Sequence, residues 1–340
     1  MTESEVFTAM RRTWQPVANV ADVPAGKVIG YKLLERDLVI AHFPDGRFLA
    51  ADVACPHKGA RLSAGSICGD SLACAYHGWT FDAQGVCNSI PSLAEPSPEK
   101  LKLSHLNSYP VQAKYGYVWV KLDPSGTHEL PEIPEFQDPK WRYVMGPPMF
   151  FAAGFRREVE NYLDMTHFAF AHRTTLGKAA APVVPPMSIT VHSDGGFEMN
   201  APFPSLSTLH EQPGKLQSAH HRQQRGYLPN FTTIRQSFNS GGQRLLVHIP
   251  SPHTVDTCTV FWSLAVSPDF DGPPVESQIE FAVKVLDEDR QMCELQIPSE
   301  VPIEPARGGW GVLVTPGDTL SVTFQKCLRQ WLVNELRAQK

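Results

Sequence analysis

Four cysteine and histidine side chains in the first quarter of the chain are spaced as two metal-binding loops. Grouped as Cys-x-His and Cys-x-x-His, they are Cys55, His57, Cys74 and His77. Thiolate sulfur and imidazole nitrogen are ligands that zinc and iron both accept. A glycine follows each pair, at Gly59 and Gly78, where a backbone without a Cβ atom can approach a bound cluster closely. The spacing therefore predicts a metal site held by two short loops.

The mixture of ligand types in each loop narrows the choice of metal. Two cysteines and two histidines can hold a tetrahedral zinc ion or a Rieske [2Fe–2S] centre, in which two histidines replace two cysteines on one iron. Zinc fingers usually pair like with like in sequence. Here each loop carries one cysteine and one histidine, so each can give its cysteine to one iron and its histidine to the other. The pattern favours the iron–sulfur cluster, with structural zinc as the alternative.

A second group of candidate ligands lies in a helix predicted over residues 157–171. Asp164 and His167 are three residues apart and share a helix face. His167 and His172 are five residues apart, which separates them by about 140° on a regular helix. Both can bind one metal only if the helix ends or bulges near residues 168–171. On spacing alone, a histidine in the protein core is the commoner interpretation.

A non-heme iron site needs two histidines and one carboxylate, and a helix predicted over residues 277–296 offers the carboxylate. Apolar side chains recur along this helix at spacings of three, four and seven, at Ile279, Ala282, Leu286 and Cys293. Asp289 falls inside this stripe. A carboxylate that faces a protein core costs several kcal/mol unless it is paired or binds a metal. Asp289 is the predicted third ligand, with Glu288 as its competitor and a salt-bridged helix surface as the alternative.

Length, composition and net charge limit the classes of protein to which these sites can belong. A length of 340 residues predicts about two domains. Hydrophobic residues make up 42% of the chain and charged residues 19%, which excludes a disordered or collagen-like protein. A net charge of −5 provides no basic field for nucleic acid or an anionic membrane. No apolar run approaches the ~18 residues of a membrane span, and an N-terminus without a hydrophobic signal region predicts a cytoplasmic protein.

The strand and turn patterns predict where the domains lie. Residues 13–122 alternate short strand candidates with turn signals, which predicts an all-β domain. Residues 123–148 are rich in Pro, Glu and Asp and are predicted to cross between two domains. Residues 149–340 follow with a helix, a run of strands and two further helices. This order predicts an α+β second domain with an antiparallel sheet.

On these motifs the sequence resembles the Rieske non-heme iron oxygenases, in their α-subunit or terminal oxygenase form. Cys-Pro-His-Lys-Gly at 55–59 and Cys-Ala-Tyr-His-Gly-Trp at 74–79 look like the two cluster loops of that family. Asn-x-x-Asp-x-x-His-x4-His, which begins at Asn161, looks like its mononuclear iron motif. The family commonly has Arg where Lys58 stands and often Pro where Ala75 stands, and neither position is a ligand.

The resemblance implies roles for particular residues. Cys55, His57, Cys74 and His77 would hold the [2Fe–2S] cluster. His167, His172 and Asp289 would hold a mononuclear Fe(II) that reacts with O2. Asp164 would bridge a ligand histidine to a cluster histidine of the neighbouring subunit, and Asn161 belongs to the same catalytic motif. Phe170, Phe231, Leu246 and His248 are candidates for the lining of the substrate pocket.

The resemblance also implies a fold and an activity. The expected fold is an all-β Rieske domain followed by a helix-grip, START-like catalytic domain with a curved antiparallel sheet, assembled as a homotrimer. The expected reaction is monohydroxylation or oxidative O- or N-demethylation of a small aromatic or heterocyclic substrate, as in the vanillate, dicamba and methylxanthine demethylases, with ring dihydroxylation a further possibility. No flavin, nicotinamide or plant-type ferredoxin motif is present. Electrons would therefore come from NAD(P)H through a separate reductase, with or without a ferredoxin.

Two other functions stay open at this point. One is a Rieske-type electron carrier without oxygenase activity. The other is a START-like ligand-binding protein with a structural metal. The iron content separates the three, because a carrier holds two irons per chain, an oxygenase holds three, and the zinc protein holds none.

Overall fold

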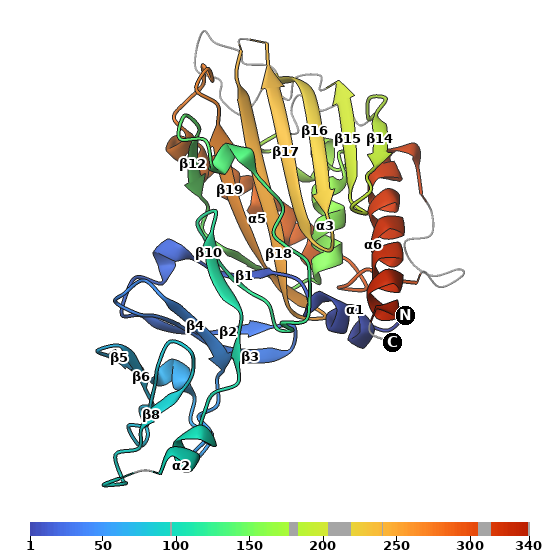
Figure 1. The fold of residues 1–340 in the computed structure, drawn as a ribbon. Helices are drawn as coiled ribbons and strands as arrows, with labels where there is room; N and C mark the ends of the chain where they lie inside the picture. The colour runs from blue at the N-terminus through green and yellow to red at the C-terminus, as the bar shows by residue number, and fades with distance from the viewer. Residues whose placement is uncertain (96, 177–182, 203–218, 240, 305–313, 339–340) are drawn as a thin grey trace. The chain divides into compact units, whose positions relative to one another are not determined.

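The computed structural model describes residues 1–95, 97–176, 183–202, 219–239, 241–304 and 314–338 (Figure 1). The chain forms two compact units, one spanning Met10–Leu130 and the other combining Met1–Ala9 with Pro131–Lys340. The division falls inside the proline-rich segment 123–148. Strand β12 (Arg142–Met145), in the second half of that segment, pairs with strand β19 (Thr257–Val266) of the second unit.

The Met10–Leu130 unit contains three small antiparallel sheets. The first has the order β1–β11–β10, over Gln15–Asn19, Tyr117–Val120 and Val111–Lys114. The second has the order β2–β3–β4–β9, over Val28–Leu33, Arg36–His42, Phe48–Asp52 and Ser108–Tyr109. The third has the order β5–β6–β7–β8, over Ser66–Cys68, Ser71–Ala73, Thr80–Phe81 and Cys87–Ser89. The short helices of the unit are α2 (Pro98–Lys102) and the 3₁₀ turns η1 (Val20–Asp22) and η2 (Leu62–Ala64).

A single hydrophobic core joins the second and third of these sheets. Alternate residues of β3 and β4 enter it, because successive side chains of a strand point to opposite faces. Its fully buried members include Val39, Ala41, Leu62, Leu72 and Phe81. Cys55 and Cys74 belong to the same cluster of side chains. The two predicted cluster loops are therefore anchored by their cysteines in one packed core.

Tyr109 links β9 to β4, the strand that leads into the loop of Cys55 and His57. Its hydroxyl donates to Asp52 Oδ1 over 2.7 Å and accepts from Asn107 Nδ2 over 2.8 Å. Asn107 Nδ2 also donates to Asp52 Oδ2. Burial raises the pKa of Tyr109 to about 12, and the neighbouring Asp52 carboxylate adds to the rise.

We expect this tyrosine to make the stability of the protein fall at alkaline pH. Between pH 10 and 12 an unfolded tyrosine loses its proton while folded Tyr109 keeps it. The unfolded state then binds fewer protons, so the free energy of unfolding decreases as the pH rises. Tyr109→Phe should unfold about 1 kcal/mol more easily at pH 8, through the lost hydrogen bond, but lose less stability above pH 10. Urea unfolding followed by circular dichroism at pH 8, 10 and 11 measures both effects, and equal pH slopes in the two proteins would contradict the assignment.

The second unit is built on one eight-stranded antiparallel sheet. The strand order is β12–β19–β18–β17–β16–β15–β14, and the strands after β19 span Gln243–Thr254, Phe231–Phe238, Ala219–Tyr227, Phe197–Pro202 and Ser188–Val191. Strand β13 (Met149–Phe151) also pairs with β19. The helices are α1 (Glu3–Met10, of which Glu3–Ala9 falls in this unit), α3 (Phe155–Leu163), α4 (Phe168–Ala171), α5 (Ile279–Leu295) and α6 (Thr319–Arg337). Shorter 3₁₀ turns are η3 (Pro134–Phe136), η6 (Val275–Gln278) and η7 (Pro316–Asp318).

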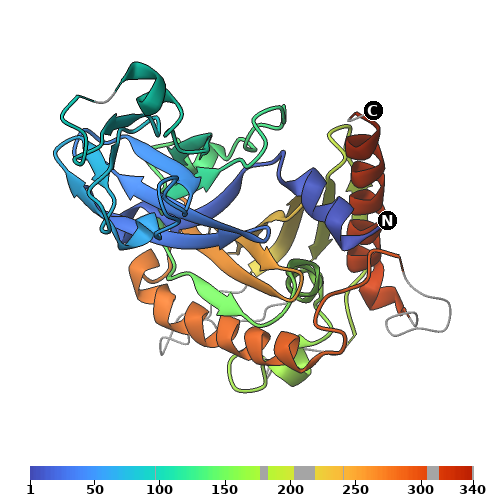
Figure 2. The ribbon, with the colours of Figure 1, turned by 90° about the horizontal axis from the view of Figure 1, so that it is seen from below.

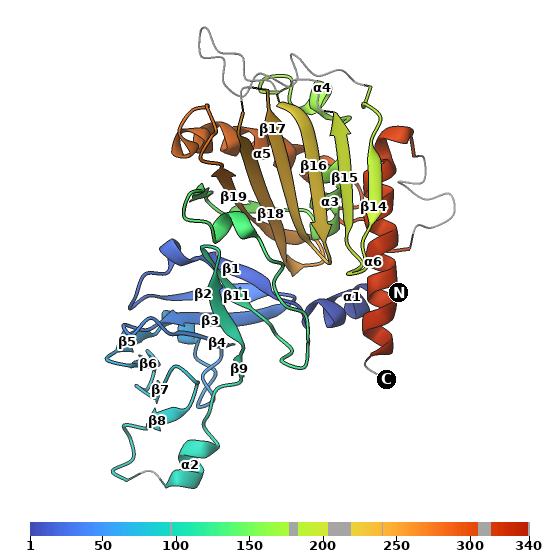
Figure 3. The same ribbon diagram turned by 45° about the horizontal axis from the view of Figure 1, so that its top comes forward.

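Helices α3 and α5 lie on the same side of this sheet, behind the strands in Figures 1 and 3. Figure 2 shows α5 (orange) and α6 (red) as two long helices that run in different directions. Phe324 of α6 packs edge-on against Phe197 of β15, with ring centroids 6.2 Å apart. The predicted α+β class, an all-β domain followed by an antiparallel sheet with helices, is confirmed. Among the helices of the described residues, none has the length and apolar character needed to cross a bilayer.

Helix α3, which carries part of the candidate site, is capped by a distant carboxylate. Its N-cap residue is Gly154, which has no side chain to cap the helix. Glu300 accepts hydrogen bonds there from the backbone N–H groups of Arg156 and Arg157, over 3.3 and 3.1 Å. A Cβ atom at Gly154 would lie 2.4 Å from the Glu300 carboxylate, so the close approach requires glycine. The two carboxyl oxygens satisfy N–H groups that have no partner within the helix, and this contact fixes where α3 begins.

Candidate metal centres and substrate cavity

The two cysteine–histidine loops of the first unit have the same backbone hydrogen bonds. In each loop the cysteine N–H donates to the carbonyl five residues later, over 2.9 Å at Cys55 and 2.8 Å at Cys74. In each loop the glycine N–H donates back to the cysteine carbonyl, over 2.9 Å at Gly59 and 3.0 Å at Gly78. Both glycines have left-handed backbone angles, with φ of 72° and 70°. This conformation favours glycine, which explains the residue type after each pair.

The four predicted cluster ligands come together between these loops. Both cysteines are buried, and the rings of His57 and His77 lie 4.4 Å apart between centroids. His57 is held in a parallel stack against Trp79, with centroids 4.6 Å apart. The Nδ1 atom of His57 is buried and has no hydrogen-bond partner among the described residues. An imidazole nitrogen left in this state is available as a metal ligand.

The thiols of this site also fit a bound metal cluster. Burial raises the pKa of Cys55 to about 11, and the adjacent Cys74 thiol contributes to the rise. Two thiolates side by side in a buried site need positive charge to compensate them, and thiolates are the ligands of iron–sulfur clusters. The donor set of two cysteines and two histidines therefore suits a Rieske [2Fe–2S] cluster.

The second predicted site is built around a break in a helix. Helix α3 ends at Leu163, and Asp164 has extended backbone angles. The Asp164 carboxylate accepts from the N–H and the hydroxyl of Thr166, each over 2.7 Å, and such turns compete with helix formation. His167 and His172 then flank the one-turn helix α4. The single helix predicted over 157–171 is wrong, because two helices lie there, and the interruption expected near residues 168–171 falls at residues 164–167.

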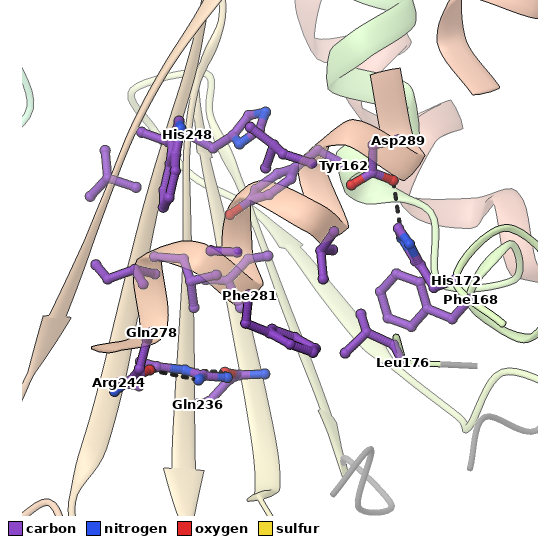
Figure 4. A pocket seen from close by; sticks show the side chains of 18 of the residues that line it. Tyr162, Phe168, His172, Leu176, Gln236, Arg244, His248, Gln278, Phe281 and Asp289 are labelled. Carbon is purple, nitrogen blue, oxygen red and sulfur yellow. Dashed lines mark hydrogen bonds and ion pairs between the residues drawn. The ribbon is translucent and has the colours of Figure 1, made fainter. Parts of the chain in front are cut away.

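Three ligand atoms converge from these separate elements. His167 Nε2 and His172 Nε2 lie 3.0 Å apart. Asp289 Oδ1, from α5, lies 3.4 Å from the first nitrogen and 3.1 Å from the second. The structure thus brings together the two predicted histidines and the predicted carboxylate, as the pair of His172 and Asp289 in Figure 4 illustrates.

The outer partners of the triad fix which atoms face its centre. His167 Nδ1 donates to Asp164 Oδ2 over 3.1 Å, and His172 Nδ1 donates to Glu288 Oε2 over 2.8 Å. Carboxylates that accept from Nδ1 hold each imidazole in the tautomer whose Nε2 is free to bind a metal. Asn161 Nδ2 donates to Asp289 Oδ1 over 2.7 Å. Glu288, the competitor of Asp289 in the sequence, therefore lies behind His172 rather than in the triad.

The electrostatics of the triad favour a bound cation. Burial opposes protonation of His167, but hydrogen bonds to Asp164 and Asp289 outweigh it and raise the pKa of His167 to about 9. Burial would raise the pKa of Asp289, yet both histidines hold it well below its usual range. Two imidazole nitrogens and one carboxylate oxygen on one face are the ligand set of non-heme Fe(II) sites.

Glu288 provides a test of the outer partners. We expect Glu288→Ala to weaken iron binding or activity by about 10- to 100-fold, the usual effect of removing a hydrogen-bonded carboxylate behind a histidine ligand. Asp287→Ala is the matched control, because Asp287 lies on the same helix and pairs with Arg290 at the surface. Iron titration of the two variants measures the difference. Equal affinities would mean that Glu288 does not support His172.

A cavity of about 120 Å³ adjoins the triad, between the sheet and helices α3 and α5 (Figure 4). Its walls are largely apolar, and the large side chains on it are Tyr162, Phe168, Leu246, Trp262 and Phe281. His248 stacks on Tyr162, with centroids 3.8 Å apart, and forms a buried pair with Glu158. A cavity of roughly 150 Å³ is known to hold benzene, so this one is on the scale of a single ring.

Two of the four predicted lining residues are found on this cavity and two are not. Leu246 and His248 line it. Phe231 packs against Tyr227 instead, and Phe170 is 63% exposed beside a larger, open depression that also contains Asp164. An aromatic residue type alone does not determine which face of a strand or a short helix a side chain occupies. The polar lining residues Arg222, Gln236 and Arg244 were not predicted, because their only signal in the sequence is their alternate position along strands.

Comparisons with known proteins give the same two-part division. Residues 13–110 match the Rieske [2Fe-2S] domain, and residues 151–334, more than half of the chain, match the vanillate O-demethylase oxygenase C-terminal domain. The chain is 28% identical over 333 residues to methylxanthine N1-demethylase NdmA of Pseudomonas putida, covering 94% of this chain and 89% of that protein. It is 27% identical over 320 residues to the toluene-4-sulfonate monooxygenase system iron-sulfur subunit TsaM1 of Comamonas testosteroni, covering 87% and 91%. The solved structure of Pseudomonas putida CBB5 NdmA with caffeine is similar with a TM-score of 0.83 and 26% identity, covering 98% of this chain and 94% of that chain.

Proposed function

This chain belongs to the vanillate O-demethylase oxygenase family and carries a Rieske [2Fe–2S] domain, and we propose that it oxidises a single-ring substrate in the cavity beside His167, His172 and Asp289. It is a Rieske-type non-heme iron monooxygenase or demethylase, the terminal oxygenase component of its system. Its cofactors are a [2Fe–2S] cluster and a mononuclear iron, and O2 is its co-substrate. The predicted family, activity class and cofactors are confirmed.

The residues proposed to hold the cofactors follow from the two constellations. Cys55, His57, Cys74 and His77 would hold the [2Fe–2S] cluster within a domain over residues 13–122. His167, His172 and Asp289 would hold the iron within a catalytic domain over residues 149–340. When bound, the iron supplies the reduction and activation of O2 that oxygenases of this kind need.

The chain's own side chains position the reaction. Asn161 holds Asp289 through its amide, and Asp164 and Glu288 orient the two histidines. The apolar walls formed by Tyr162, Phe168 and Phe281 exclude water and place an aromatic ring beside the ligands. The observation that carries the proposal is that all three ligand residues lie on the wall of this cavity.

The reaction type proposed is monohydroxylation or oxidative demethylation. Demethylation is hydroxylation of a methyl group next to oxygen or nitrogen, followed by loss of formaldehyde. The relatives are named as demethylases and as a monooxygenase subunit, and one solved relative is described with caffeine, a methylated heterocycle. A small aromatic or heterocyclic compound with a methyl, methoxy or N-methyl group is therefore the expected substrate.

Electrons are proposed to come from NAD(P)H through a separate reductase, with or without a ferredoxin. The chain carries no nucleotide-binding or flavin motif of its own. We further propose a cytoplasmic homotrimer in which Asp164 meets the cluster histidines of a neighbouring subunit. The proposal is supported by the partial exposure of Asp164, which lines an open depression.

The two alternative functions account for only part of the molecule. An electron carrier has no use for a second metal triad in a separate unit. A ligand-binding protein with structural zinc explains neither the mixed cysteine–histidine loops nor a carboxylate and two histidines at the cavity wall.

A single-turnover experiment tests the proposal without a reductase. The anaerobic protein is reduced with dithionite, mixed with O2 and a panel of methoxy- and N-methyl-substituted aromatic compounds, and assayed for formaldehyde and hydroxylated products. We expect product from at least one aromatic or heterocyclic compound and none from His172→Ala. Turnover of aliphatic quaternary amines, but of no aromatic compound, would contradict the proposed substrate class.

A further inference from the structure

A row of polar side chains crosses the sheet at one end of the cavity. Arg222 on β16, Gln236 on β17 and Arg244 on β18 are directly opposite one another in the strand register. All three line the cavity, together with Gln278 from η6. Neighbouring strands lie about 4.8 Å apart, so the two arginines flank one amide within a single row.

The guanidinium of Arg244 is bonded only to neutral oxygens among the described residues. Its Nε and Nη2 atoms donate to Gln236 Oε1 over 3.0 and 2.6 Å, and its Nη1 atom donates to Gln278 Oε1 over 3.0 Å. A guanidinium has five N–H groups, so two remain available after these three bonds. Within the described part of the chain, the amide nitrogen of Gln236 likewise has no acceptor. This end of the cavity therefore offers donors and positive charge.

A buried, protonated guanidinium such as that of Arg244 is energetically unfavourable unless an anion pairs with it. Arg244 is 4% exposed. Burial lowers the pKa of Arg244 to about 10, so it remains protonated at neutral pH. A buried charge without an opposite charge is strongly unfavourable. Asp289 is the single acid among the described residues that line the cavity, and it is engaged with the two histidines.

The two polar ends of the cavity are separated by its apolar part. Figure 4 shows Arg244, Gln236 and Gln278 in a row at one end and Asp289 with His172 at the other, with Phe281 between them. In the next row of the sheet toward the middle, Ile234 of β17 lies directly opposite Leu246 of β18, and both of these apolar side chains line the cavity. A ring bound against these apolar residues would point one substituent at the triad and another at the arginine.

We propose that Arg244, supported by Gln236, Gln278 and Arg222, binds an anionic oxygen substituent of the substrate, so that this oxygenase acts on aromatic carboxylates or sulfonates. A guanidinium matches both groups, because its parallel N–H bonds fit two oxygens of one anion. The inference deepens the proposed function and rests on it, since it names the class of ring compound that the same cavity takes.

The test compares acids with neutral compounds of nearly the same shape. Anaerobic titration calorimetry on the holoenzyme measures binding of 4-methoxybenzoate against 4-methoxybenzamide, and of 4-methylbenzenesulfonate against 4-methylbenzenesulfonamide. We expect at least one acid to bind roughly 10- to 100-fold more tightly than its amide, the usual effect of hydrogen bonds to a charged group. The ratio should fall close to one in Arg244→Gln.

Two further variants keep the test decisive. If Arg244→Gln folds poorly, Arg244→Lys takes its place in the test. It keeps the charge but loses the paired N–H groups, so it should retain only part of the preference for acids. Arg225→Gln is the control, because Arg225 lies three residues along β16 from Arg222, is not among the residues that line the cavity, and pairs with the exposed Asp194. This variant should keep the full preference. Equal binding of acids and amides by the wild-type protein, or an unchanged preference in a folded Arg244→Gln, would overturn the proposal.

Single turnover separates this inference from the proposed function. Oxidation of neutral ring compounds without any preference for acids would leave the oxygenase assignment standing and remove the anion site. Tight binding of acids that are never oxidised would support the anion site and contradict the proposed reaction.

Discussion

Replacing Asp289 with alanine is expected to remove the mononuclear iron and leave the Rieske cluster in place. Asp289 is buried, and its Oδ1 atom lies 3.1 and 3.4 Å from the two histidine nitrogens. Even the loss of an outer partner costs about 10- to 100-fold in metal affinity or activity, so we expect loss of a ligand to lower turnover by more than ~100-fold. Iron analysis should show about two irons per chain in the variant, with unchanged visible bands.

Glu280→Ala is the control for this variant. Glu280 lies on the same helix, is exposed, and pairs with Lys284 at the surface. It should keep the iron content and the activity of the wild-type protein. If Asp289→Ala kept its third iron, the carboxylate ligand would have to come from elsewhere in the chain.

The second large effect is expected from Asp164→Asn, which should separate electron transfer from metal binding. The asparagine oxygen can still accept from His167 Nδ1, so both metal sites should remain filled. The negative charge, however, is lost at the group proposed to link His167 to a neighbouring subunit. We expect turnover to fall by at least ~100-fold, the upper range for an outer partner of a ligand histidine.

Stopped-flow spectroscopy distinguishes this effect from a structural one. In the variant, the reduced cluster should keep its spectrum but be reoxidised slowly when substrate and O2 are added. Asp194→Asn, at an exposed ion pair in the turn between β14 and β15, should behave as the wild-type protein does. Rapid reoxidation and normal turnover in Asp164→Asn would remove the proposed bridge.

The parts of the site that could be predicted depend on local sequence. The ligands of each cluster loop are at most three residues apart, so spacing alone brings them together. Asp289 was identified because an acidic residue inside an apolar stripe has to face the interior of the protein. The predicted fold class followed from the order of strands and helices and is confirmed.

The parts that were missed depend on tertiary structure. The helix break before His167 comes from the turn at Asp164, where a side chain competes with the backbone hydrogen bonds of the helix. The role of Glu288 behind His172 was also missed, because it depends on where His172 lies in the folded chain. The row formed by Arg222, Gln236 and Arg244 depends on the register of three strands, which sequence patterns do not determine.

Iron analysis of anaerobically purified wild-type protein, combined with its visible spectrum, examines both metal sites at once. We expect about three irons per chain with broad Rieske bands, two in the cluster and one beside the cavity. A ferrous chelator should remove one iron and leave the bands unchanged. Intact bands with only two irons after incubation with Fe(II), or zinc without visible bands, would contradict the presence of a Rieske cluster and a mononuclear iron in one chain.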